Sequence, residues 1–208
     1  MQERTGLLVS HRSALWRWLA AATAVFSLTA ASAQAATTVY ADTTTPLQAA
    51  AADPQVGSVM PGTPLTVLGT SGAQSHVQLA GWVIKGSETV LFEGVGLHAV
   101  LATFDASAKV PMKILKTQKD SYGTVWEQVE VTGYVSTKAT APKQADVWNQ
   151  AANLYQTRCS ACHALHDPTE FTANQWPGVL KAMGQNAALD QQQLNLITAY
   201  LQAHAKAQ

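Results

Sequence analysis

Both cysteines of the 208-residue chain lie in one pentapeptide, Cys159-Ser160-Ala161-Cys162-His163. Cys-x-x-Cys-His is the attachment pattern of c-type haem. Two thiols on one turn of chain reach the two vinyl groups of a single porphyrin, and the histidine that follows donates a ring nitrogen to the iron. The pattern therefore predicts one covalent haem c, with Cys159 and Cys162 as attachment residues and His163 as the proximal iron ligand.

Two other uses of a Cys-x-x-Cys pair fit the chain less well. A thioredoxin-like pair follows a strand, whereas Val147, Ala151 and Tyr155 recur at helical spacing before the cysteines. A zinc site of the Cys or His type needs four ligands, and the chain has no second Cys-x-x-Cys. Haem is therefore the favoured interpretation over both alternatives.

The ligand on the other face of the iron is less closely defined. His166 is too near His163 in sequence to cross to the opposite face. Met183 lies 20 residues beyond His163, on a short helix that is predicted to begin at Trp176. We expect Met183 to be the distal ligand, which raises the iron potential relative to a second imidazole, and we expect Trp176 to pack on the haem. His204 is the alternative ligand, and packing on the porphyrin edge is the alternative role of Met183.

The β-type part of the chain comes before the haem region. From residue 37 to 138, apolar runs of strand length alternate with turn signals. This texture predicts an SH3-like region, as one elaborated barrel or two small ones, joined by a linker at 139–145 to a helical haem region at 146–208. The expected fold class is α+β with two domains, an all-β SH3-like barrel region followed by a small all-α class I-like cytochrome c domain.

An internal repeat supports the barrel. The segment VQLAGWV (77–83) resembles VEVTGYV (129–135), and a shorter apolar strand precedes each of them, PLTVL and PMKIL. Each copy is predicted to be strand, turn, strand, glycine and aromatic strand, with the aromatic residues Trp82 and Tyr134 filling a barrel-like core. Buried packing is also the expected role of Trp126 and Trp148.

The N-terminal segment predicts export. Residues 1–35 combine three arginines, a short apolar run and small-x-small cleavage sites, as in a secretory leader, with an uncleaved anchor as the alternative. After cleavage the protein is expected to be periplasmic and not embedded in the membrane. The formal net charge of the full chain is zero. The series Lys109, Lys113, Lys116 and Lys119 indicates a solvated face and no nucleic-acid partner.

The assembled motifs resemble a known family. CSACHALHDPTEFTANQWPGVLKAM and LDQQQLNLITAYLQAHAK, with PGTPLTVLG, VLFEGVGLHAVLAT and WEQVEVTGYV before them, are similar to the TorC/DorC-type pentahaem cytochromes of trimethylamine N-oxide respiration. The likeness runs from about Val39 to the end. It covers the SH3-like segment and the C-terminal monohaem domain of that family, without the membrane-anchored tetrahaem part.

The resemblance implies a function. We expect a periplasmic monohaem electron carrier that delivers electrons to a molybdenum-containing N-oxide or S-oxide reductase and receives them from a separate multihaem quinol-oxidising cytochrome. Such a protein is not itself an enzyme. Two alternatives are a haem protein with an open iron site for gas or peroxide chemistry, and a haem-sensing SH3-like binding module. An exposed aromatic groove at Trp82 or Tyr134 would favour the module.

Overall fold

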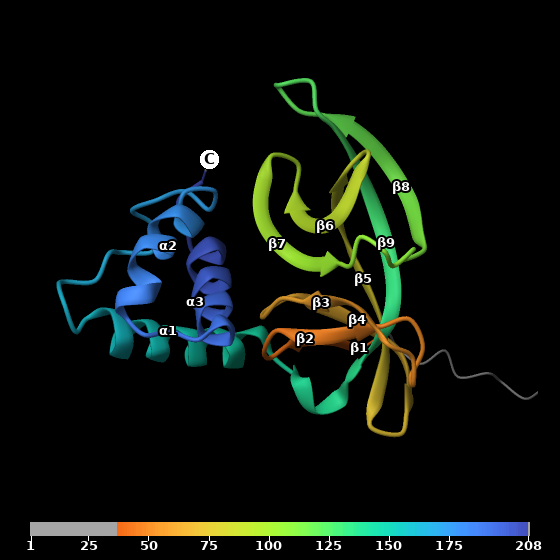
Figure 1. Cartoon of the computed structure of the whole chain (residues 1–208), viewed down its shortest axis with the longest axis horizontal. Helices are drawn as coiled ribbons and strands as arrows, with labels where there is room; N and C mark the ends of the chain where they lie inside the picture. The colour runs from red at the N-terminus through yellow and green to blue at the C-terminus, as the bar shows by residue number, and fades with distance from the viewer. Residues whose placement is uncertain (1–36, 208) are drawn as a thin grey trace, which may run out of the picture. The chain divides into compact units, whose positions relative to one another are not determined.

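The computed structural model describes residues 37–207, so the predicted leader at 1–35 lies outside the described residues. Ten strands precede three α-helices in this part of the chain (Figure 1). The strands are β1 (Thr37–Ala41), β2 (Thr45–Gln48), β3 (Gln55–Val59), β4 (Pro64–Ser71), β5 (Gln74–Ile84), β6 (Ser87–Gly94), β7 (Leu97–Phe104), β8 (Met112–Lys119), β9 (Val125–Ser136) and β10 (Thr140–Ala141). The helices are α1 (Gln144–Cys159), α2 (Trp176–Asn186) and α3 (Gln191–Ala203), and a 3-10 turn spans Thr137–Ala139.

Six of the strands close into one barrel. The two longest strands, β5 and β9, pair antiparallel from Gln74↔Ser136 to Ile84↔Trp126. The ring then runs β5–β6–β7–β3–β2–β9 and returns to β5, as the long β5–β9 ribbon in Figure 1 shows. The expected α+β class, a β-barrel region followed by a helical region, is confirmed, and the β region is one barrel and not two.

The barrel consists of two copies of a four-stranded unit, β2–β5 and β6–β9. Their pairings match strand for strand, including irregularities between Leu47 and Gln48 and between Leu91 and Phe92. The β4–β5 and β8–β9 hairpins also shift register at matching places, between Val67 and Gly69 in the first and between Ile114 and Lys116 in the second. Leu79 pairs with Val131, its own counterpart in the sequence repeat. The predicted repeat is therefore confirmed, and the copies are related by an approximate two-fold axis.

Each copy uses its repeated glycine for a close crossing of strands. A Cβ atom on Gly81 would lie 2.7 Å from the carbonyl oxygen of Phe92, and one on Gly133 would lie 2.9 Å from that of Gln48. A side chain at either position would push β6 or β2 away from the ribbon. The two glycines are therefore needed where the barrel closes.

The prediction that Trp82 and Tyr134 fill the barrel core is wrong. Both are half-buried on the outer face, because neighbouring residues of a strand point to opposite faces and the two glycines take the inward positions. The ammonium group of Lys116 lies 5.1 Å above the Trp82 ring, and Tyr134 stacks on His76 with ring centroids 4.7 Å apart.

Hydrophobic side chains from the strands fill the interior of the barrel. Trp126, which was expected to be buried, is 1% exposed, and its indole N–H donates to Asp120 at 2.9 Å. The core of the barrel is made of Ala41, Leu47, Val59, Leu65, Val77, Leu79, Val83, Leu91, Ala102, Phe104, Val129, Val131 and Val135.

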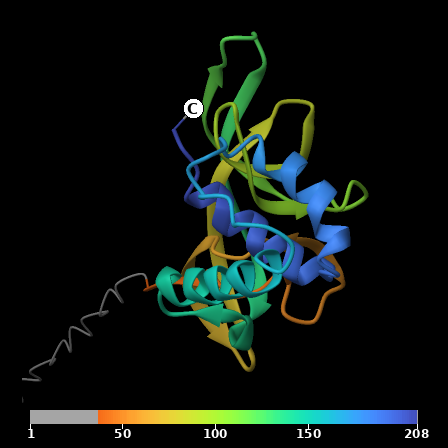
Figure 2. The same ribbon diagram turned by 90° about the vertical axis from the view of Figure 1, so that its left-hand side faces the viewer.

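The helical part has a smaller core. Figure 2 shows α1 and α3 crossing, with α2 beside them. The buried members of this core are Tyr155, Trp176, Leu180, Ile197 and Leu201. A capping box starts α3: the Asp190 side chain accepts from the backbone N–H of Gln193, and the Gln193 side chain accepts from that of Asp190.

The segment expected to be a linker is ordered against the barrel. Residues 139–145 contain β10, which pairs with β1, and the first two residues of α1. Trp148 lies over Gly62, where a Cβ atom would lie 2.0 Å from the indole. Side-chain amides of the helical part make the remaining polar contacts with the barrel: Gln144 with Gly62, Gln150 with Asp42, Asn174 with Gly96 and His98, Gln192 and Asn195 with Thr44, and Gln202 with His98.

Candidate functional site

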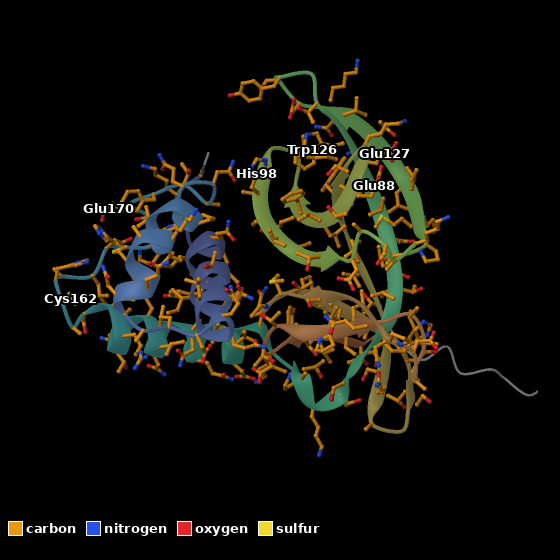
Figure 3. The ribbon with its side chains drawn as sticks, viewed as in Figure 1. Glu88, His98, Trp126, Glu127, Cys162 and Glu170 are labelled. Atoms are coloured by element: carbon orange, nitrogen blue, oxygen red, sulfur yellow. The ribbon has the colours of Figure 1, made fainter. Side chains whose placement is uncertain are left out.

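The two cysteines lie where α1 ends. Cys159 is the last residue of α1 and is half-buried, and burial raises the pKa of its thiol. Cys162 follows in an exposed turn (Figure 3) and is not bonded to Cys159. Both thiols are free, and one turn of chain carries both of them. This is the arrangement that covalent attachment to one porphyrin requires.

His163 is held with one ring nitrogen available. Its Nδ1 lies 2.6 Å from the carbonyl oxygen of Ala164. A carbonyl can only accept a hydrogen bond, so Nδ1 donates and Nε2 keeps its lone pair. A backbone acceptor of this kind selects the tautomer that binds a metal through Nε2. The imidazole is exposed, so its tautomer is set by the neighbouring backbone carbonyl and not by burial.

His166 is occupied elsewhere in the same loop. Its Nδ1 lies 2.8 Å from a carboxylate oxygen of Glu170, and its backbone carbonyl accepts a hydrogen bond from the Tyr155 hydroxyl at 2.9 Å. Burial, and secondarily the nearby Cys159, raises the pKa of Tyr155 to about 12. Tyr155 thus stays a neutral donor and ties the loop to α1.

Trp176 supports the same loop from the other side. It is fully buried, donates its indole N–H to the carbonyl oxygen of Pro168 at 3.0 Å, and packs edge-on against Phe171 with ring centroids 5.0 Å apart. Its contact with a haem stays a prediction. The observed role is to connect α2 to the chain that follows the cysteines.

Met183 and His204 have different neighbours in the helical part. Arg158, next to Cys159, donates to the carbonyl oxygen of Ala188 at 2.9 Å, and this bond joins the end of α1 to the turn that follows half-buried Met183. The His204 ring packs on Trp148, with centroids 5.9 Å apart. Trp148 is about 16 Å from Cys159 along α1, at about 1.5 Å per residue.

The side chains around the cysteines fit a haem. Half-buried apolar residues from all three helices and the loop pack on the small core: Leu154, Leu165, Phe171, Val179, Leu189 and Leu194. The Nε atom of Arg158 is buried and has no hydrogen-bond partner, and a haem propionate is an acceptor of the kind that it lacks. Within residues 37–207 no cluster of three His, Cys, Asp or Glu side chains could hold a bare metal ion.

Sequence reasoning missed Tyr155 and Arg158 as parts of this site. Tyr155 was recognised as a helical core position, and its hydroxyl bond to residue 166 had no signal in the sequence. Arg158 precedes the first cysteine directly, so its position next to the motif was the available clue. Its bond to Ala188, 30 residues away, depends on how α1 and α2 pack.

Two family models match the chain. The model for the TorC third cytochrome c domain matches residues 33–140, and the model for dihaem cytochrome c matches residues 155–208. The first range includes strands β1 to β9 and contains no cysteine. The second range contains the single Cys-x-x-Cys-His motif, which begins at Cys159.

Curated relatives give the same picture. The chain is 33% identical over 153 residues to the cytochrome c-type protein TorY of Escherichia coli O157:H7, and 27% identical over 171 residues to the cytochrome c-type protein TorC of Escherichia coli K12. These matches cover 73% and 81% of this chain but 42% and 44% of the relatives. The chain therefore spans less than half the length of these relatives. No solved structure matches it.

Among the described helices, none has the length and apolarity to cross a bilayer.

Proposed function

Because the chain belongs to the TorC family of c-type cytochromes, we propose that it is a periplasmic one-electron carrier with a single covalent haem c. The observation that carries the proposal is the free thiol pair at the end of α1, followed by a histidine whose Nε2 is available. Two cysteines suffice for the two thioether bonds of one haem and for no more.

Each residue of the site has a distinct task. Cys159 and Cys162 would hold the haem covalently, and His163 would bind its iron through Nε2, while the Ala164 carbonyl holds the tautomer. The haem supplies a ferric/ferrous couple when bound. Arg158 offers its free Nε to a propionate, and the half-buried apolar side chains exclude water from the ring. The protein then exchanges electrons without binding a substrate at the iron.

We assign the distal position to Met183. The Arg158–Ala188 bond keeps the chain after Met183 next to the cysteine end of α1. His204, the alternative, packs on Trp148 near the opposite end of that helix. If His163 and Met183 both held the iron, it would have no open position for oxygen, peroxide or nitric oxide, and this would distinguish a carrier from a gas-binding protein or a peroxidase.

The proposed partners follow from the family resemblance. The acceptor is a periplasmic molybdenum-containing N-oxide or S-oxide reductase, and the donor is a multihaem quinol-oxidising cytochrome. Both proposals concern this chain's place in a longer electron path, since it corresponds to less than half of the curated relatives.

Ferric spectra of the haem-loaded protein test the site. Wild type is expected to show the charge-transfer band of methionine–iron ligation, Met183→Ala to lose it, and His204→Ala to keep it. Retention of the band in Met183→Ala would overturn the ligand assignment. A high-spin wild-type spectrum with rapid cyanide binding would replace the carrier with an open-iron protein.

A re-oxidation assay tests the acceptor. Dithionite-reduced, desalted protein is mixed with a purified molybdenum N-oxide reductase, and the ferrous absorbance is followed after trimethylamine N-oxide is added. We expect re-oxidation only when both enzyme and substrate are present, and the same protein with an S-oxide substrate and its reductase separates the two substrate classes. Protein that stays reduced with both reductases would refute this choice of partner.

A further inference from the structure

The two repeats of the barrel differ in what covers them. The outer edge of β4 carries β1, which pairs from Thr37↔Val67 to Tyr40↔Pro64. The matching strand of the second repeat, β8, ends the sheet, and no described strand pairs with its outer edge. A sheet edge of this kind offers a row of backbone N–H and C=O groups to another strand.

Matched positions show what the missing strand exposes. Val67 is half-buried under β1, whereas its counterpart Ile114 is 56% exposed. Leu65 is fully buried, whereas its counterpart Met112 is half-buried. The next matched pair, Leu68 and Leu115, is similarly exposed at 47% and 44%, so the difference is limited to the positions of Leu65 and Val67. The second repeat thus lacks the cover that the first obtains from β1.

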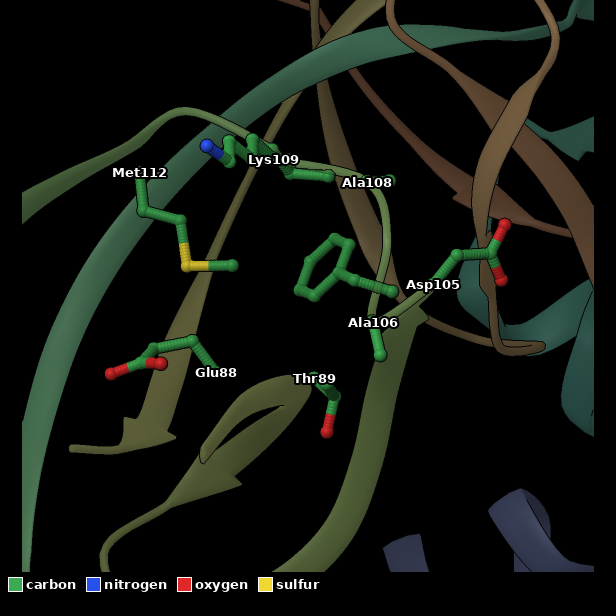
Figure 4. A pocket seen from close by; sticks show the side chains of 9 residues that line it. Glu88, Thr89, Asp105, Ala106, Ala108, Lys109 and Met112 are labelled. Atoms are coloured by element: carbon green, nitrogen blue, oxygen red, sulfur yellow. The ribbon is translucent and has the colours of Figure 1, made fainter. Parts of the chain in front are cut away.

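The surface beside this edge is also bare. In the first repeat the β3–β4 loop is covered by α1, with Gly62 under Trp148, and Thr44 is bonded to Gln192 of α3. The corresponding β7–β8 loop borders an open cavity of about 320 Å³, shown in Figure 4. Its lining includes Glu88, which is the counterpart of Thr44, and Phe104, Asp105, Lys109, Val110 and Met112.

The charges along β8 indicate what can bind to its outer edge. The strand β8 carries Lys113, Lys116 and Lys119 and no acidic residue. Lys113 pairs with Glu130 on β9 at 2.9 Å, whereas Lys109, Lys116 and Lys119 form no ion pair with any described residue. Two copies of the chain joined through β8 would bring their lysines together, which is unfavourable. A strand with carboxylates meets no such repulsion.

We propose that the outer edge of β8 binds an extended acidic segment of a partner protein, and that the adjoining cavity, whose lining includes the carboxylates of Glu88 and Asp105, takes no part in the acidic contact. The segment adds to β8 as an antiparallel strand, as β1 does to β4, and main-chain hydrogen bonds supply most of the recognition. Its carboxylates face Lys116 and Lys119, and the exposed Ile114 provides apolar contact. This surface is separate from the cysteine loop, so the proposal stands whether or not the assigned redox partners are right.

Binding to a defined probe tests the proposal. Isotope-labelled, haem-loaded protein is titrated with a blocked peptide of alternating valine and glutamate, and amide hydrogen exchange is followed along β8. We expect slowed exchange of β8 amides that face away from β9, and affinity that falls as salt rises. The same peptide with lysine in place of glutamate should bind at least about tenfold more weakly, since like charges disfavour contact.

Variants locate the effect. The double change Lys116→Glu with Lys119→Glu should weaken the acidic peptide by roughly tenfold, because two rim charges change sign. The control, Lys138→Glu with Lys143→Glu, alters net charge equally on exposed residues outside β8 and should leave the affinity within about twofold, because any remaining effect acts at long range and is screened. No change in β8 exchange, or equal losses in both double variants, would overturn the proposal. If sedimentation shows a salt-dependent dimer that substitutions in β8 break, the partner of the β8 edge is a second copy of this chain and not an acidic segment.

Discussion

The barrel and the helical part reach stability by different means. The core cluster of the barrel contains thirteen buried residues, all of them from strands, in a closed ring with few strand edges. The core cluster of the helical part contains five buried residues, and nine partly buried hydrophobic residues pack against it. The barrel thus completes its core from its own chain, whereas the proposed haem would add apolar surface to the smaller core of the helical part.

The largest expected effect breaks the helical side of this comparison. In Cys159→Ala with Cys162→Ala no thioether can form, so the Soret absorbance should be lost and amides of α2 and α3 should exchange with solvent. The barrel amides should keep their protection, because its core contains no haem contact. Hydrogen exchange measured by NMR on both proteins checks this difference. A helical part as protected as in wild type would show that its five-residue core is sufficient.

A substitution in the barrel should have the opposite pattern. A Cβ atom on Gly81 would lie 2.7 Å from a backbone oxygen and 2.8 Å from Leu91, so Gly81→Val should destabilise the barrel by about 3 kcal/mol or more. Chemical denaturation followed by Trp126 fluorescence measures the change. The control is Gly69→Ala, which meets no atom within 4 Å. Similar losses in both variants would count against the close crossing of strands.

The contact between the two parts is expected to respond less. Gly62 has a φ of +78° and lies under Trp148, so Gly62→Ala should cost about 1–3 kcal/mol through strain and a displaced indole. Limited proteolysis should then cut faster between β10 and α1, while the haem spectrum stays that of wild type. Trp148→Ala is the matched variant, and it should relieve the clash in the double mutant. Unchanged proteolysis in Gly62→Ala would show that the contact of Gly62 with Trp148 does not hold the two parts together.

The smallest effect concerns one carboxylate of the β8–β9 hairpin. The hydrogen bond from Trp126 is the main cause that lowers the pKa of Asp120 below its usual value. A lowered folded-state pKa means that the carboxylate stabilises the hairpin above the unfolded pKa of about 3.9 and loses this effect as pH falls through the folded value. The indole N–H resonance of Trp126 should titrate in that acid range, and Asp120→Asn should abolish the titration. A midpoint above that of a free aspartate would contradict it.

Local sequence patterns predicted the candidate haem residues and the fold class. The Cys-x-x-Cys-His spacing named three residues without any packing information, because all of them lie within one turn of chain. The echo between 77–83 and 129–135 likewise predicted a repeated strand unit, in one barrel or in two, and the structure confirms the repeat through matching register and matching irregularities.

The sequence did not predict which side chains of a strand point into the barrel. Alternation shows that Gly81 and Trp82 point to opposite faces, but which of them is inside depends on where β6 crosses β5. That crossing joins segments brought together only by folding, and it reversed the expected roles of Trp82 and Tyr134.

Short-range chemistry was therefore determined by the amino-acid order: thiols, imidazole, turns and the strand period all depend on near neighbours in the chain. Contacts between distant segments decided the rest, including the bond of Arg158 to Ala188, the cover that β1 gives to β4, and the bare edge of β8. Such contacts depend on the closure of the whole barrel and on how the helices pack, and no local pattern in the chain specifies them.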